Sequence, residues 1–109
     1  MAHDEKLAER VRELIEQPAI EKRMFGGLAF MLQGNMALCV SGQGGMLLRI
    51  DDDAERDRLL AREHVGPMVM GNQTSTTWLH VEAPALKTKR QLEGWVRRGE
   101  AAAHARPPK

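Results

Sequence analysis

The chain has 109 residues, the length of one domain, and its 42% hydrophobic and 28% charged residues are ordinary for a globular protein. A formal net charge of +1 excludes a strong overall attraction to nucleic acid or membranes, and two Trp, two Phe and no Tyr make stacking of single-stranded nucleic acid difficult. The single cysteine, Cys39, excludes an internal disulfide, and no apolar stretch reaches the roughly 18 residues of a membrane span, so we expect a cytoplasmic protein without membrane contact.

An amphipathic helix is predicted near the start of the chain. Leu7, Val11, Leu14 and Ile15 recur at helical spacing and therefore share one face. Charged side chains fill most positions between them. We expect the apolar face to pack on the core and the charged face to lie in solvent.

A series of short strands is predicted next, over residues 20–25, 28–32, 36–41 and 46–50. The breaks between them contain glycine or asparagine, which supply the positive φ that tight hairpin turns need. Because the strands follow one another through short turns, we expect them to pair antiparallel. Side-chain alternation places Cys39 on one face together with Ala37 and Ser41, and the larger apolar neighbours of Cys39 on the other.

The second half of the chain predicts another helix and two more strands. The helix is expected over residues 51–63, because its acidic first turn suits the positive end of a helix dipole. Gly66-Pro67 is expected to break the pattern before a short edge strand over residues 68–70. A loop and a further strand over residues 76–81 follow.

A third helix is predicted to close the domain. Thr88 and Gln91 have the spacing of a capping box at its start. The residues at helical spacing that we expect on its buried face are Leu92, Trp95, Val96, Gly99 and Ala103. The order of elements favours an α+β fold with two layers, an antiparallel β-sheet with the helices packed on one face. We expect a single domain over residues 1–109, with an ordered core at about 4–105.

Residues with reactive side chains are few and scattered, so no catalytic site, metal site or cofactor is predicted. The histidines have no second ligand at the spacings of metal sites. Cys39 lacks a base or cation beside it in sequence and is interpreted as a packing residue. The glycine-rich segment at residues 41–45 leads into a strand, whereas phosphate-binding loops lead into a helix.

The C-terminal helix is predicted to be basic. Arg90, Arg97 and Arg98 are candidates for contacts with phosphates or with an acidic partner. The simpler interpretation is a solvated helix flank, in which Glu93 and Glu100 pair with part of this charge.

Several segments resemble the N-terminal domain of the TfoX/Sxy competence regulators: RMFGGLAFM at residues 23–31, GNMA at 34–37, WLHV at 78–81 and the Trp95-Val96 pair followed by Arg98-Gly99. The resemblance implies a two-layer α+β domain related to secretion-chaperone-like folds, a link to regulators of natural transformation, and no catalytic motif. Full-length regulators carry a second, helical domain, and we expect a stand-alone N-terminal domain here.

The leading hypothesis is therefore a non-enzymatic regulatory domain that binds a protein. We expect Met68 and Met70, on the edge strand, to be exposed and to form the partner surface, because edge strands and methionine patches readily bind partners. The partner is unidentified, and a homodimer is one form it could take. The alternative is weak nucleic-acid binding through Arg90, Arg97 and Arg98; a ligand pocket between sheet and helices ranks below both.

Overall fold

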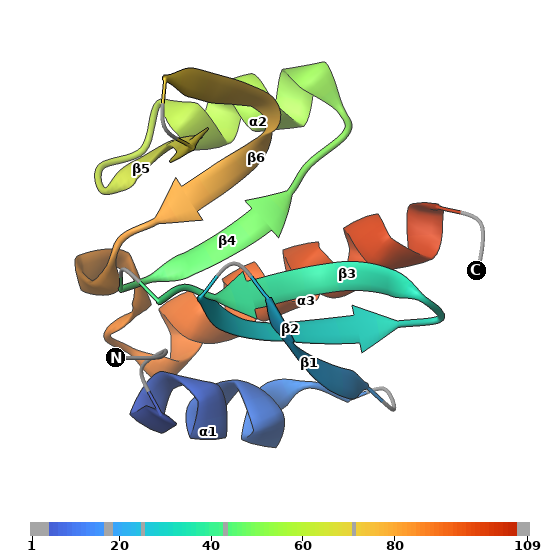
Figure 1. Cartoon of the computed structure of the whole chain (residues 1–109). Coiled ribbons are helices and arrows are strands. Elements are labelled where there is room, and N and C mark those ends of the chain that lie inside the picture. Colours follow the sequence, from blue (N-terminus) through green and yellow to red (C-terminus); the bar gives the residue numbers. More distant parts are fainter. Residues whose placement is uncertain (1–4, 17–18, 25, 43, 71, 107–109) are drawn as a thin grey trace.

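The computed structural model describes residues 5–16, 19–24, 26–42, 44–70 and 72–106. Within them the chain forms three α-helices, a short 3₁₀-helix and a six-stranded sheet (Figure 1). The elements are α1 (Glu5–Leu14), β1 (Ile20–Met24), β2 (Gly27–Leu32), β3 (Asn35–Val40), β4 (Met46–Arg49), α2 (Asp53–Leu60), β5 (Val65–Met70), β6 (Gln73–Val81), η1 (Ala83–Leu86) and α3 (Lys89–Ala105). The predicted α+β class is confirmed.

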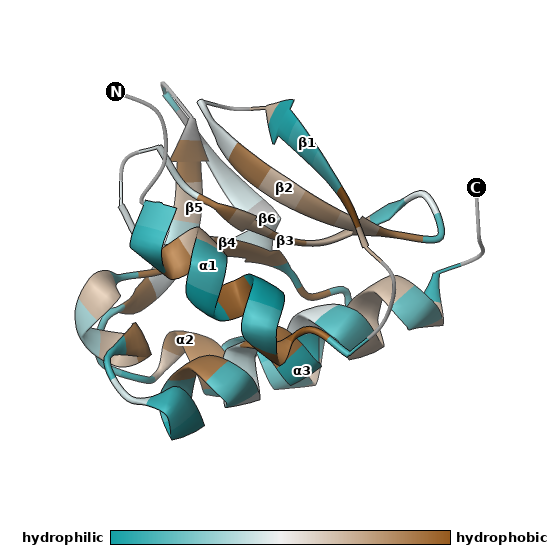
Figure 2. Cartoon of the chain, turned by 90° about the horizontal axis from the view of Figure 1, so that it is seen from below, coloured by the Kyte–Doolittle hydropathy of each residue, from teal (hydrophilic) through white to brown (hydrophobic). Residues whose placement is uncertain are grey.

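The sheet is antiparallel throughout, in the order β1-β2-β3-β4-β6-β5, so β1 and β5 are its two edges. The helices lie together on one side of the sheet, as Figure 2 shows in a view from below. The main core fills the space between them and joins α1 and α3 to side chains from β2, β3, β4 and β6. The predicted two-layer arrangement is therefore confirmed.

The predicted buried faces of α1 and α3 are confirmed, except that Ile15 follows the end of α1 and is half-buried. Leu7, Val11 and Leu14 of α1 are buried. In α3 the buried residues are Leu92, Trp95, Val96, Gly99, Glu100 and Ala103. The capping box at the start of α3 is present, because Thr88 Oγ1 accepts from the Gln91 N–H at 3.0 Å and Gln91 Oε1 accepts from the Thr88 N–H at 3.0 Å.

The β2–β3 hairpin turns at Gln33 and Gly34, whose φ values of 54° and 84° match the paired left-handed residues of a two-residue turn. The predicted turn included Asn35, but Asn35 begins β3 and is buried. Its side-chain amide donates to the carbonyls of Ala103 and Arg106, at 3.3 and 3.4 Å. Carbonyls in the last turn of a helix lack partners within the helix, and Asn35 supplies hydrogen bonds to this end of α3.

A β-bulge changes the predicted alternation along β3. Phe30 pairs with Leu38 and Met31 with Met36, so Ala37 is the extra residue. Ala37 packs with Leu32 and Ala103, whereas Cys39 packs in a separate cluster. The prediction that Ala37 shares a face with Cys39 is wrong, because a bulge puts two successive residues opposite one and breaks the period of two.

The second half of the sheet is longer than predicted and α2 is shorter. Gly66-Pro67 lies within β5, where an edge position tolerates the missing N–H of proline. β6 begins at Gln73, so most of the residues predicted to form a loop before residue 76 belong to this strand.

The acidic run is confirmed as a helix N-terminus: Asp52 caps α2 by accepting from the N–H of Ala54 at 3.0 Å. None of the described helices has the length and apolar character that crossing a membrane requires.

Candidate functional site

The sheet face opposite the helices carries a second apolar cluster built from strand residues. Buried Ala29, Cys39, Leu47 and Met68 form its base, and Met24, Met31, Met36 and Trp78, all partly exposed, pack around them. We call these eight residues the open face. No described helix residue belongs to this cluster, and in Figure 2 the helices all lie on the other side of the sheet. A contiguous apolar surface rich in methionine is typical of a binding site.

The strand register sets the charge of the open face. Lys22 pairs with Ala29, and Arg49 pairs with Trp78, so both cations share this face. Arg49 is partly neutralised by Asp51, at 2.9 Å. Glu21 is the one acidic residue within the described strands; it pairs with Phe30 on the helix side and accepts two hydrogen bonds from Arg12 of α1, at 2.7 and 2.8 Å. The open face is therefore apolar with a cationic margin.

The predicted partner residues on the edge strand need a correction. β5 is an edge, as predicted, but Met68 is buried, with 9% of its surface exposed. The side chain of Met70 lies outside the described part of the structure. Pro67 pairs with Leu79 of the helix-side core, so strand alternation places Met68 on the other face of the sheet, within the cluster that forms the open face. Val69, at 58% exposed, is a large apolar side chain that β5 presents to solvent.

Cys39 lies at the base of the open face and is fully buried. Burial raises the pKa of its thiol from 9.0 to about 11, so the reactive thiolate is rare at neutral pH. The predicted packing role of Cys39 agrees with this environment.

We predict that a thiol reagent such as DTNB modifies Cys39 in the native protein at pH 8 at least a hundred-fold more slowly than in denaturant. The shift of two pKa units alone removes about this much thiolate. The folded thiol also resists ionisation, so the contribution of Cys39 to stability is complete below pH 9 and declines as the pH rises toward 11. Native and denatured rates within tenfold of each other would contradict the buried environment.

Arg97 is committed to a network between α1 and α3. Its guanidinium donates to Glu100 at 2.7 Å and to the Leu14 carbonyl at 2.9 Å, and lies 3.4 Å from both Glu16 and Glu93. The hydrogen bond to Glu100, opposed by a smaller burial effect, raises the pKa of Arg97. The predicted pairing along this helix flank is confirmed, and Arg97 has little capacity left for a phosphate.

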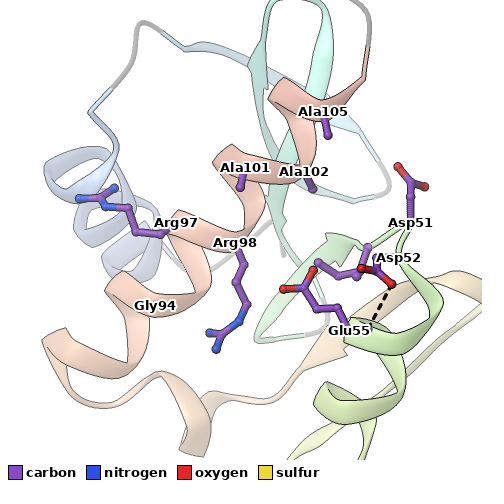
Figure 3. Close-up of a pocket in the computed structure, with 10 residues that line it drawn as sticks. Asp51, Asp52, Glu55, Gly94, Arg97, Arg98, Ala101, Ala102 and Ala105 are labelled. Atoms are coloured by element: carbon purple, nitrogen blue, oxygen red, sulfur yellow. Dashed lines mark hydrogen bonds between the residues drawn. The ribbon is translucent and has the colours of Figure 1, made fainter.

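Arg90 and Arg98 lie apart from Arg97. Figure 3 shows Arg97 pointing toward α1, whereas Arg98 points to the side of α3 that faces α2. Arg98 and Arg90 both line a groove on this second side. Arg97 and Arg98 both line a second groove of α3. Contacts of these three arginines with phosphates or with an acidic partner stay a prediction.

A larger groove, of about 440 Å³, runs between the start of α2 and α3 (Figure 3). The α3 side of the groove includes the small residues Ala101, Ala102 and Ala105 together with Arg97 and Arg98. The other side carries the carboxylates of Asp51, Asp52 and Glu55. Two of these carboxylates have structural tasks: Asp51 pairs with Arg106 at 3.3 Å, and Asp52 caps α2. Among the described residues no group of three or more His, Cys, Asp or Glu side chains is placed to hold a metal ion.

The sequence missed the open face as a unit, although its signal was present. Met31, Cys39, Leu47 and Trp78 alternate with the core residues along their strands. Such alternation with apolar residues on both faces indicates a sheet that is apolar on both sides. The described helices all pack on the other side of the sheet, so they leave this apolar side uncovered.

The model of the TfoX N-terminal domain family matches residues 9–103. No curated protein and no solved structure matches the chain.

Proposed function

The chain belongs to the TfoX N-terminal domain family, and we propose that this competence-regulator-like domain acts without catalysis, by binding a protein partner through the open face. The observation that carries the proposal is the uncovered cluster of Met24, Met31, Met36 and Trp78. These side chains are exposed enough to touch a partner and rest on a buried base that holds them in place.

Charge favours a particular kind of partner. Lys22 and Arg49 lie on the open face, and no acidic strand residue does. A partner segment that combines apolar side chains with carboxylates would fill the cluster and pair with these cations. A second copy of the domain would offer no strand carboxylate on the equivalent face, so we propose a different protein rather than a homodimer.

We predict that peptides selected for binding to the immobilised domain are apolar and acidic, and that Met31→Glu combined with Met36→Glu weakens their binding at least tenfold. Met31 and Met36 are neighbours across β2 and β3 on the open face, and both are partly exposed. Two new carboxylates there would repel an acidic partner and disrupt its apolar contacts. Dissociation constants measured by titration calorimetry provide the test.

The matched control is Ala101→Glu, which adds a carboxylate at an exposed position of α3, away from the open face. We expect it to leave peptide binding within twofold. Selected peptides that bind the double methionine variant as tightly as the unmodified domain would contradict the proposal. Rising salt should weaken binding, because part of the attraction is between exposed charges.

A further inference from the structure

Three arginines gather in a groove on the far side of the domain from the open face. Arg62, just after α2, and Arg90 and Arg98 of α3 line a cavity of about 380 Å³. Its volume lies within the range of roughly 300–1,000 Å³ that small-molecule sites occupy. The groove takes no part in the proposed docking of a protein.

Trp95 positions two of these guanidiniums. The Cζ atoms of Arg62 and Arg98 lie over the Trp95 ring, at 5.6 and 5.0 Å from its centroid. Trp95 itself is 3% exposed and belongs to the main core, so its ring is a fixed support. Cation–π contacts of this length hold the two cations near each other without neutralising them.

The charge of the groove is left unbalanced. Within the described part of the chain, Arg62, Arg90 and Arg98 form no ion pair and no side-chain hydrogen bond. Burial, and then the positive charge of Arg62, lowers the pKa of Arg98, while Glu55 partly opposes this effect. Glu63, the carboxylate in the groove wall, is 95% exposed at its side chain. Like charges held together in this way are stabilised when an anion binds between them.

We propose that this groove binds a phosphate group, either free or as a monoester, held by the guanidiniums of Arg62, Arg90 and Arg98. A phosphate dianion has three terminal oxygens and accepts charge-assisted hydrogen bonds from several arginines, whereas a carboxylate is satisfied by fewer. Stacking of a nucleic-acid base is not part of this site, because Trp95 is buried beneath the arginines. The expected ligand is therefore free phosphate or a small phosphorylated molecule.

The test is calorimetric titration of the intact chain with inorganic phosphate and with adenosine 5′-monophosphate, at constant ionic strength, with chloride as the reference anion. We expect saturable binding of phosphate that chloride does not reproduce. Arg98→Gln should raise the dissociation constant at least tenfold, and Arg90→Gln should also weaken binding. Arg90 is exposed and off the tryptophan ring, so this variant remains informative if Arg98→Gln disturbs the fold.

Arg58→Gln is the matched control, because it removes the same charge from an exposed site of α2 outside the groove. Equal affinity for phosphate and adenosine 5′-monophosphate would identify the phosphate group alone as the ligand. Tighter binding of the nucleotide would identify a larger phosphorylated ligand. Failure of both to bind, or equal losses in Arg58→Gln and Arg98→Gln, would overturn the proposal and leave the docking function untouched.

Discussion

Replacing Gly99 by alanine is expected to destabilise the domain by about 1–3 kcal/mol, the usual cost of adding an atom to a close-packed contact. A Cβ at position 99 would lie 2.5 Å from the Ala37 carbonyl oxygen and 3.1 Å from Leu48 Cδ2. The carbonyl belongs to the bulge of β3, so the backbone of α3 must move away from the sheet. Chemical denaturation of the variant measures the loss.

Gly94→Ala is the matched control for this prediction, because the same substitution is made in the same helix. Its Cβ would meet only the end of the flexible Arg98 side chain, at 3.3 Å. Alanine is favoured over glycine in a helix interior by about 1 kcal/mol. We therefore expect Gly94→Ala to be neutral or stabilising. Similar losses at positions 94 and 99 would show that α3 does not approach β3 closely at Gly99.

Replacing Arg97 by leucine is expected to cost about 2 kcal/mol, the order of the penalty for leaving a buried charged group without its partner. The Glu100 side chain is 6% exposed, and its remaining described contact is the N–H of Glu16, at 3.1 Å. Arg97 is 35% exposed at its side chain, so solvent screens part of the effect. The free energy of unfolding of the variant provides the measurement.

A double-mutant cycle separates the ion pair from simple loss of packing. If Glu100 is destabilising once its partner is gone, adding Glu100→Leu to Arg97→Leu should recover stability, since two apolar residues often replace a buried ion pair at little cost. If the two stability losses simply add in the double variant, the two side chains are not coupled and this account is contradicted.

Local signals in the sequence predicted most of the fold. The Thr88 capping box and the apolar spacing of α1 and α3 depend on residues within a few positions of one another, and these predictions are confirmed. The bulge at Ala37 could not be predicted in this way, because it is a property of the pairing between β2 and β3. The role of Asn35 at the end of α3 joins residues 68 positions apart, and no local pattern reveals it.

In the candidate sites, too, the residue types could be predicted from the sequence, but the contacts between distant residues could not. Basic residues of α3 were identified from sequence, but their grouping depends on the direction in which each side chain leaves the helix. Arg97 joins α1, whereas Arg98 joins Arg62 over Trp95, a partner distant in the chain. The burial of Met68 likewise depends on its packing with Ala29, Cys39 and Leu47, which come from strands far away in the sequence. The Gly66-Pro67 pair had predicted a break before Met68, but it lies inside β5.

The most direct test of the open face is the NMR spectrum of the methionine methyl groups during titration with a peptide selected on the domain. Met24, Met31 and Met36 surround the open face, whereas Met46 is fully buried in the helix-side core and serves as an internal reference. We predict that the resonances of Met24, Met31 and Met36 shift progressively to saturation while that of Met46 stays in place. Saturable binding that leaves these three resonances unchanged would contradict the assignment of the open face as the partner surface.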